Sequence, residues 1–359
     1  MFGAWIAYTL RRAGHTVTLF DPYGTAHSRA SSGGESRIIR CCYGADEIYT
    51  RMAQRSLTLW TDFFAATKRP QLFQRTGVLW LTEPDDRHAN ASRLALRDAK
   101  IDFEDLSPAE LRRRYPQINA PSHVGAILER NAGALMARQA VQAVVEEFVR
   151  IGGIHRQVAL QPPQKERTAT DILIYACGPW LGKLFPEILS SRLFLTRQEI
   201  LFFGIPPGDA RFQPPQLPVW LDFGTERGMY GFPDLETRGF KLASDRHGPP
   251  IDPDTADRLV SAGTAQQMRA YLAERFPALA SAPVVDARVC QYENTSNGDF
   301  IIDRHPAYEN VWLAGGGSGH GFKHGPAIAE YLTGVLSGGS AEQRFSLASK
   351  KTVQSRTVF

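Results

Sequence analysis

Gly3 and Asp21 have the types and the spacing of part of a dinucleotide-binding motif. Gly3 precedes a stretch with helical periodicity, and Asp21 ends a short run of β-forming residues 18 positions later. A separation of about 20 residues is typical between the glycine loop that approaches a pyrophosphate and the carboxylate that binds the adenosine ribose. An ordinary helix–strand pair has the same pattern, so these two residues alone predict only half of a nucleotide-binding site.

A glycine-rich turn later in the chain is also suited to binding. The segment 310–336, NVWLAGGGSGHGFKHGPAIAEYLTGVL, begins as an apolar strand, passes through glycines and continues as a helix opened by Pro326. Exposed backbone N–H groups and the positive end of a helix favour an anion or the electron-rich edge of a ring. The alternative is an ordinary glycine-rich turn.

Other segments must position these residues. The segment DILIYACGPW, residues 171–180, reads as a buried strand that enters a tight turn, which in an α/β sheet lies at the ligand-binding edge. Helical periodicity covers Glu47–Phe64 and Arg138–Arg150, whereas short alternating runs between Leu195 and Leu242 predict antiparallel strands. We therefore predict an α/β fold, in which a Rossmann-like nucleotide-binding domain is interleaved with an antiparallel-sheet substrate domain.

The composition excludes several classes of protein. Of the 359 residues, 43% are hydrophobic and 22% are charged, which is typical of a globular chain of about two domains. The net charge of +4 is spread without a basic block, so we expect no nucleic-acid partner. No apolar run is long enough to cross a bilayer and no secretory leader is recognisable, so we expect a cytoplasmic protein without a membrane partner. The cysteines form neither a disulfide framework nor a metal-binding pattern, and we predict no metal site.

Seven short motifs, some of them within the segments described above, carry a family resemblance. They are GGESRIIRCCYG at residues 33–44, ACGPW at 176–180, YGFP and FKL within 230–242, CQY and FIIDRHP within 290–306, and GSGHGFK at 317–323. In order and spacing they resemble the FAD-dependent amine oxidases of the D-amino-acid oxidase superfamily, in particular the branch of monomeric sarcosine oxidase and N-methyl-tryptophan oxidase. The resemblance implies an FAD-binding domain of residues 1–68, 136–182 and 285–340, a substrate domain of residues 69–135 and 183–284, and a tail of residues 341–359.

FAD is the cofactor that this resemblance implies. Cys290 matches the cysteine that holds the flavin through a thioether in the sarcosine-type enzymes, so we predict covalent attachment there; a buried, inert cysteine is the alternative. Arg37 matches an arginine that lies against the flavin ring. The predicted cofactor-binding set is Gly3, Asp21, Ser31, Ser36, Arg37, Gly178, Trp180, Cys290, Gly317, Gly319, Gly321 and Lys323.

The same resemblance assigns catalytic roles. Arg40 and Lys323 match the residues that hold the substrate carboxylate, a role for which a planar guanidinium and an ammonium are suited; a surface salt bridge is the alternative for Arg40. Lys241 matches the lysine that promotes the reaction of reduced flavin with oxygen, because a cation stabilises the superoxide formed first. A lysine on a strand could instead extend to solvent. Tyr230 and Tyr292 match aromatic positions around the substrate pocket, where packing is the default role of a tyrosine.

The chain also departs from that family pattern. Asp245 stands four positions after Lys241, where the sarcosine-type enzymes have an active-site histidine, although His247 lies nearby. Gly33 stands where that branch has another histidine, and Ser36 replaces a threonine while keeping the hydroxyl. We therefore expect the pocket to accept a different amine.

The predicted activity is that of an FAD-dependent oxidase of a secondary amine or an amino acid. A hydride equivalent passes to the flavin, water hydrolyses the imine, and oxygen is reduced to hydrogen peroxide. We expect a small-molecule amine or amino acid and molecular oxygen as partners, and a monomer. The alternatives are a flavin dehydrogenase with another electron acceptor, an inactive binding protein and, with least support, a nicotinamide dehydrogenase, which gives no role to Cys290.

The residues before Gly3 lack the first strand and the two earlier glycines of the FAD motif. Without them the sheet would expose apolar strands and the pyrophosphate would lose its binding turn. We therefore expect a longer protein with about ten further residues upstream.

Overall fold

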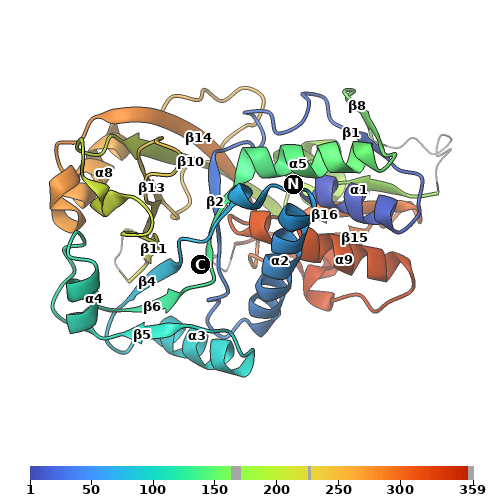
Figure 1. Ribbon diagram of the computed structural model, residues 1–359. Helices are drawn as coiled ribbons and strands as arrows, with labels where there is room; N and C mark the ends of the chain where they lie inside the picture. The colour runs from blue at the N-terminus through green and yellow to red at the C-terminus, as the bar shows by residue number, and fades with distance from the viewer. Residues whose placement is uncertain (163–170, 225–227, 355–359) are drawn as a thin grey trace.

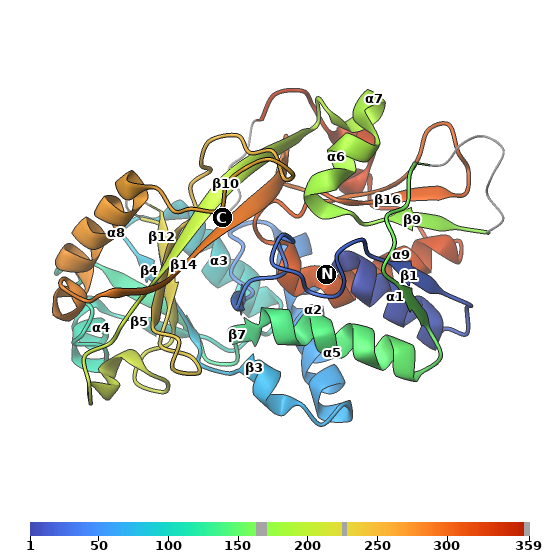
Figure 2. The same cartoon turned by 90° about the horizontal axis from the view of Figure 1, so that it is seen from above.

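A computed structural model describes residues 1–162, 171–224 and 228–354. Figures 1 and 2 show two parts side by side, which we call the helical part and the sheet part. The helical part contains helices α1 (Phe2–Arg12), α5 (Ala137–Arg150) and α9 (Gly325–Leu336), which pack on one another, together with small sheets. The sheet part is built on one large twisted sheet covered by helix α8 (Ala262–Arg275).

Two small sheets of the helical part contain parallel strand pairs. Strand β1 (Thr18–Phe20) pairs in parallel with β8 (Ile154–Arg156), and β9 (Leu173–Tyr175) pairs in parallel with β16 (Val311–Gly315). Strand β15 (Ile301–Arg304) completes the second of these sheets in the antiparallel sense. Because β9 and β16 run in the same direction, the turns that follow them lie at one edge, where α/β sheets bind ligands.

Helix α1 shows how the sequence produces this packing. Its buried residues run from Ala4 to Tyr8, and its last turn carries Arg11 and Arg12, which favour the negative end of the helix dipole. The Trp5 ring lies 4.9 Å from the Trp60 ring and meets it edge to face. The helix therefore attaches to helix α2 (Glu47–Ala66) through aromatic packing.

The sheet part has eight strands in the described residues. Their order is β14 (Val284–Thr295), β10 (Leu193–Phe203), β13 (Phe240–Ser244), β12 (Met229–Phe232), β11 (Val219–Asp222), β4 (Val78–Thr82), β6 (Gly125–Glu129) and β5 (Glu104–Leu106). Neighbouring strands are antiparallel except for β11 and β4, which are parallel. In Figure 2 the long strands β10 and β14 lead from the sheet part towards the helical part.

A fourth sheet of the described residues is short and has three strands. Strand β7 (Gly133–Met136) pairs with both β2 (Ser36–Ile39) and β3 (Phe73–Gln74). The remaining elements are α3 (Arg87–Asp98), α4 (Pro108–Arg114), α6 (Leu181–Leu184), α7 (Pro186–Leu189) and the 3₁₀ turns η1 (Pro70–Leu72), η2 (Gly178–Trp180), η3 (Ala210–Phe212), η4 (Pro277–Leu279), η5 (Gly321–His324), η6 (Gln343–Phe345) and η7 (Leu347–Ser349). No helix within the described ranges is long and apolar enough to span a membrane.

The predicted α/β fold and its main elements are confirmed. Helices α2, α5 and α9 and strands β9 and β16 coincide with the segments expected from periodicity. Residues 285–295 of β14, which the prediction assigns to the FAD-binding domain, pair with β10 in the sheet part, and the division into domains stays a prediction. Within the segment predicted as a tail, Phe345 is buried in the main core. Residues 225–227 of the predicted strand region and 355–359 of the tail lie outside the described residues.

Candidate functional site

Lys241 is buried at the meeting point of two sheets. It lies on β13, is 3% exposed, and its Nζ donates to the carbonyl oxygen of Ser36 at 2.9 Å and to the Ser36 Oγ at 3.1 Å. The Nζ also lies 4.2 Å from the centre of the Phe232 ring. Burial lowers the pKa of Lys241 well below its ordinary value, and the positive charge of Arg37 lowers it further. The lysine is held inside the protein and does not extend to solvent.

Arg37 and Cys290 lie beside this lysine. The Arg37 guanidinium donates to the carbonyl oxygens of Ser36 and Ser31 at 2.7 and 2.5 Å, and its Nη2 is 3.5 Å from the Cys290 Sγ. The Ser31 Oγ donates to the Gln291 carbonyl oxygen at 2.8 Å, which fixes this loop against β14. We call Ser31, Ser36, Arg37, Lys241 and Cys290 the cysteine–lysine cluster. A cavity of about 40 Å³, which is room for water, lies against it.

A second cluster holds two buried cations on one tyrosine. The Arg40 guanidinium carbon is 4.6 Å from the centre of the Tyr43 ring and 4.8 Å from that of Trp80, and Arg40 also donates to the Cys42 carbonyl oxygen. The Lys323 Nζ donates to the Tyr43 hydroxyl at 2.7 Å and to the His320 carbonyl oxygen at 3.3 Å. Arg40 and Lys323 are each 4% exposed. Two cations so placed can bind a carboxylate.

Glu129 fixes the turn that carries Arg40. Its carboxylate accepts the backbone N–H groups of Cys41 and Cys42 at 2.7 and 3.0 Å, and it is 3% exposed. Burial lowers the pKa of Lys323 well below its ordinary value. The negative charge of Glu129 acts in the opposite direction and raises that pKa. Glu129 therefore orients the turn and partly balances the two cations.

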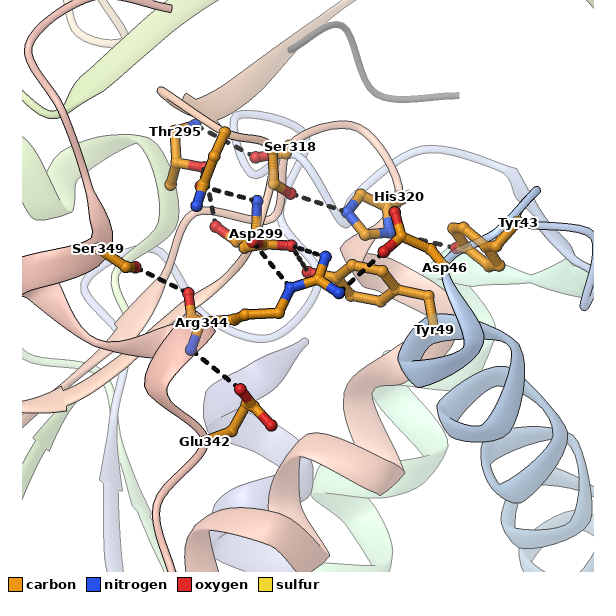
Figure 3. Close-up of polar contacts among 12 residues, drawn as sticks. Tyr43, Asp46, Tyr49, Thr295, Asp299, Ser318, His320, Glu342, Arg344 and Ser349 are labelled. Atoms are coloured by element: carbon orange, nitrogen blue, oxygen red, sulfur yellow. Dashed lines mark hydrogen bonds and ion pairs between the residues drawn. The ribbon is translucent and has the colours of Figure 1, made fainter. Parts of the chain in front are cut away.

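A polar network continues behind Tyr43 (Figure 3). The Tyr43 hydroxyl lies 2.8 Å from the His324 Nε2 and 3.2 Å from the His320 Nδ1. The Tyr49 hydroxyl donates to the Asp299 Oδ1 at 2.8 Å, and its ring lies 4.8 Å from that of His320. Burial lowers the pKa of His324 well below its ordinary value, so its ring is neutral and keeps one N–H group. The network leaves the Tyr43 oxygen oriented towards Lys323.

Asp245 and two tyrosines lie next to the cations. The Tyr292 hydroxyl donates to the Asp245 Oδ1 at 2.9 Å, and Tyr230 is within hydrogen-bond reach of Tyr292. A Cβ added to Gly319 would lie 2.8 Å from the Tyr292 ring, so the glycine-rich turn contacts this tyrosine closely. The nearby His247 does not take the place of Asp245 in this contact. Its Nδ1 lies 3.1 Å from the Gln354 Nε2, whereas the Tyr292 hydroxyl donates to Asp245.

The other predicted residues lie at the edge of the parallel sheets. Gly3 is in the first turn of α1, where a Cβ would lie 3.4 Å from the Ala176 Cβ. Asp21 follows β1 and accepts the Tyr23 N–H at 2.9 Å. Trp180 donates from its Nε1 to the Asp254 Oδ1 at 2.7 Å. These residues belong to neither the cysteine–lysine cluster nor the cation pair.

Two glycines at this edge face open space. No heavy atom lies within 4 Å of a Cβ built on Gly178, which has a φ of +55°, and Gly317 meets only the Gly321 Cα at 3.9 Å. Glu293 lies nearby and accepts the Gly316 N–H at 2.9 Å through its Oε2. Its Oε1 is buried and has no hydrogen-bond partner among the described residues, and burial raises the pKa of Glu293 to about 7.

Sequence reasoning missed three residues of the site. Tyr43 was part of a matched motif, but nothing in the motif indicates that its hydroxyl binds Lys323. Glu129 and Glu293 are acids inside strands, and a charged residue in an apolar strand is the one signal that could have identified them. The partner of each depends on strand pairing, which the sequence leaves undetermined.

A family model described as DAO, FAD dependent oxidoreductase, matches residues 1–334. The chain is 30% identical to the monomeric sarcosine oxidase of Bacillus sp. (strain B-0618), over 99% of this chain and 96% of that protein. It is 29% identical to the peroxisomal sarcosine oxidase of Homo sapiens, over 92% and 88%, and 27% identical to the N-methyl-L-tryptophan oxidase of Salmonella heidelberg, over 91% and 90%.

Solved structures share the fold. L-proline dehydrogenase from P. horikoshii has a TM-score of 0.82 at 17% identity, covering 96% of this chain and 94% of that one. Amadoriase I from Aspergillus fumigatus has a TM-score of 0.77 at 19% identity, covering 96% and 87%.

Proposed function

Since the chain belongs to the family of FAD-dependent oxidoreductases, we propose that it is an oxidase of a secondary amine or an amino acid. The family match also confirms the resemblance drawn from the motifs. The observation that carries the proposed activity is the buried pair of cations, Arg40 and Lys323, on the single tyrosine Tyr43. Such a pair has no structural need for burial, but it is suited to a substrate carboxylate.

The residues at the edge of the parallel sheets fit FAD. The open space beside Gly178 and Gly317 would admit a ligand close to the backbone, and the unpaired Glu293 Oε1 would accept a hydroxyl or N–H group. The first turn of α1 at Gly3 suits the pyrophosphate, and Asp21 suits the ribose. The other residues proposed to bind FAD are Ser31, Ser36, Arg37, Trp180, Gly319 and Gly321.

FAD would supply the acceptor for a hydride and pass the electrons to oxygen. Arg40 and Lys323 would bind the substrate carboxylate and orient the carbon beside the nitrogen. Trp80 and Tyr43 would exclude water from Arg40. Tyr230 would line the same pocket. Lys241 would hold positive charge where oxygen reacts, since a buried cation stabilises negative charge that develops on oxygen.

The proposal includes a thioether between Cys290 and FAD. Support comes from the Cys290 Sγ, which lies 3.5 Å from the Arg37 Nη2 and within the electrostatic influence of Lys241. Cys290 also lines the small cavity beside this cluster, together with Arg37 and Lys241. Acid precipitation of the FAD-loaded protein should leave the flavin in the pellet, and the Cys290→Ser variant should release it into the supernatant.

A peroxide assay tests the activity. The protein, with FAD supplied during expression, is incubated in air with N-methyl and cyclic amino acids, and hydrogen peroxide is measured. Peroxide in amounts equal to the amine consumed supports the proposal. Reduction of an artificial dye without peroxide would identify a dehydrogenase, and a protein that stays colourless with FAD would identify an inactive binding protein.

The proposed enzyme is monomeric and cytoplasmic. A relative at 30% identity is named a monomeric oxidase, which supports the first property. Light scattering after size-exclusion chromatography should give a mass near 39.9 kDa, and fractionation of cells should recover the protein with the cytoplasm.

A further inference from the structure

Asp245 occupies a fixed position beside the cation pair. It follows β13, and its backbone N–H donates to the Gly228 carbonyl oxygen at 2.8 Å. Its Oδ1 accepts the hydroxyl of Tyr292, whose own oxygen is in turn within reach of Tyr230. The two hydroxyls therefore form a chain that ends on the carboxylate, which keeps the side chain in one orientation.

Asp245 and the two tyrosines beside it are half-buried. Tyr230, Asp245 and Tyr292 are each partly exposed, whereas the other residues of β12 and most of those of β13 are buried. Asp245 is therefore accessible to a small molecule bound beside it.

The charge of Asp245 is not balanced by an ion pair. In the described part of the chain, no pair within 4.0 Å joins it to Arg40 or to Lys323. Burial raises the pKa of Asp245 to about 6, and Tyr292, Arg40 and Lys323 counteract that rise. Above this pH the site holds a carboxylate whose hydrogen-bond partner, Tyr292, is neutral, and such a charge is costly to bury unless a ligand supplies positive charge.

The geometry points to Asp245 as the residue that binds the amino group of the substrate as a cation and then removes one proton from it. This inference rests on the proposed function and narrows it to amino acids that bind as zwitterions. The substrate carboxylate would bind Arg40 and Lys323, and the ammonium would bind the Asp245 carboxylate. One ligand would thereby satisfy two cations and one anion.

The proton balance is simple. A secondary ammonium gives one proton to the Asp245 carboxylate, which becomes a carboxylic acid, and the nitrogen regains its lone pair. The neutral amine can then lose a hydride from the adjacent carbon, with FAD of the proposed function as the oxidant. The nitrogen becomes an iminium, which water hydrolyses after release.

Other titratable groups near Asp245 do not replace it. His247 lies on the outer side, with its ring 6.3 Å from that of Tyr292, and burial lowers its pKa, so it is neutral near pH 7. Arg37 and Cys290 act on Tyr230 through their charges from the cysteine–lysine cluster. Asp245 is the acid of this group that contacts Tyr292.

Paired ligands test the inference. N-methylglycine and methoxyacetate have nearly the same shape, as do proline and tetrahydrofuran-2-carboxylate, but the second member of each pair has an ether oxygen in place of the amine. Calorimetry at pH 7.5 without oxygen, on protein whose FAD has first been reduced so that it cannot accept a hydride, gives each dissociation constant. We expect the amine to bind at least tenfold more tightly than its ether in at least one pair.

The Asp245→Asn variant should bind the amine and its ether with affinities within about twofold of each other. The amide keeps an oxygen for the Tyr292 hydroxyl, so the fold is retained. The control is Asp98→Asn at the exposed end of α3, which should keep the full preference. A preference that survives in Asp245→Asn, or an ether that binds the wild type as tightly as its amine in both pairs, overturns the inference.

The pH profile gives a second readout. In the wild type, kcat/KM should fall below about pH 6, where Asp245 is protonated. Tyr292→Phe should move this fall to higher pH, because the hydroxyl that stabilises the carboxylate is lost; an unchanged fall contradicts the assignment. If the amine preference depends on Asp245 but no peroxide forms, the proposed oxidase fails and the binding role of Asp245 stands.

Discussion

At the scale of single residues, Lys323 shows how the protein keeps a charge inside. Its ammonium donates to the Tyr43 hydroxyl and to the His320 carbonyl, and the Tyr43 ring lies 5.1 Å away. Glu129 and Asp245 supply negative charge nearby. These groups replace the water that an ammonium loses on burial, and they leave part of its charge for a ligand.

Lys323→Met should weaken substrate binding strongly. The variant keeps the length of the side chain but loses a charged hydrogen bond worth about 1.5–3 kcal/mol. We expect kcat/KM for an amino acid to fall about 10- to 100-fold. Steady-state peroxide assays measure the change, with Lys351→Met, an exposed site, as the control. Equal losses in both variants would contradict the assigned role.

The ionised Asp245 carboxylate should lower the free energy of unfolding at alkaline pH. Its folded-state pKa of about 6 is above the ordinary value of 3.8, so its stabilising contribution is complete below 3.8 and is lost as pH rises through 6. At pH 8 the carboxylate therefore destabilises the fold. We expect Asp245→Asn to raise the free energy of unfolding at pH 8 by about 1–2 kcal/mol, after allowance for partial exposure.

Urea unfolding of the FAD-free protein at pH 8 and at pH 4 measures this effect. The difference between Asp245→Asn and the wild type should be present at pH 8 and should nearly vanish at pH 4. A variant that is less stable at pH 8 would show that the carboxylate is compensated in the fold.

At the scale of elements, the turn between β16 and η5 positions the site. Gly319 has a φ of +78°, and a Cβ there would lie 2.8 Å from the Tyr292 ring. Gly334 in α9 has ordinary helical conformation and nothing within 4 Å of its missing Cβ. A methyl group would therefore collide with Tyr292 at Gly319 and would meet no atom at Gly334.

Gly319→Ala should displace Tyr292 and lower kcat/KM at least tenfold, with a loss of stability of about 1–2 kcal/mol from backbone strain. Gly334→Ala should leave kcat/KM unchanged and stabilise the protein by about 0.5–1 kcal/mol, because alanine favours helix. Kinetics and urea unfolding of both variants decide. Normal kinetics in Gly319→Ala would show that the turn tolerates the displacement.

The 3₁₀ turn η6 ties the last segment to the site (Figure 3). The Arg344 Nη2 donates to the Asp299 Oδ1 at 2.7 Å, and its Nη1 lies 2.8 Å from the Oδ1 of Asp46, at the start of α2. Tyr49 of the same helix shares Asp299. The last segment thereby supports the helix start that follows the Arg40–Tyr43 turn.

Arg344→Met should destabilise the protein by about 1–3 kcal/mol, because Asp299 stays buried with one partner fewer. The control is Arg51→Met, which removes an exposed ion pair with Glu47 on α2 and should cost less than about 0.5 kcal/mol. Urea unfolding compares the two. Equal effects would mean that the bridge to Asp299 contributes no more than a surface pair.

At the scale of the whole molecule, one apolar core crosses the boundary between the two parts. It contains Trp5, Phe63 and Val144 of the helical part together with Trp80 and Leu221 of the sheet part. Strand β14 also pairs along its length with β10 in the sheet part before it leads to β15 in the helical part. Each part also has an apolar cluster of its own, but the shared core and strand β14 couple the two parts.

Unfolding of the FAD-free protein should accordingly occur in a single step. Tryptophan fluorescence reports on both parts, since Trp60 lies in one and Trp220 in the other, and far-ultraviolet circular dichroism reports on helices. The two signals should give the same midpoint in urea. Two separate midpoints would show that the core does not couple the parts.

Much of this arrangement follows from the sequence. The helices Glu47–Ala66 and Ala137–Arg150 and the strand–turn–helix at 311–336 were predictable because apolar spacing, glycines and Pro326 act locally. The matched motifs also indicated FAD and the family. The roles of Arg40, Lys241 and Cys290 came with that resemblance and stay predictions that the experiments above can test.

The tertiary structure alone decided which residues meet. Lys323 contacts Tyr43 across 280 positions and Lys241 contacts Ser36 across 205, and neither pair is marked by any local pattern. The register of β14 against β10 puts Cys290 opposite Gln198 and Tyr292 opposite Thr196, so the two side chains share one face of the sheet. A shift by one residue would turn both away, which is why burial and pairing across the whole chain, and not the order of residues, set the site.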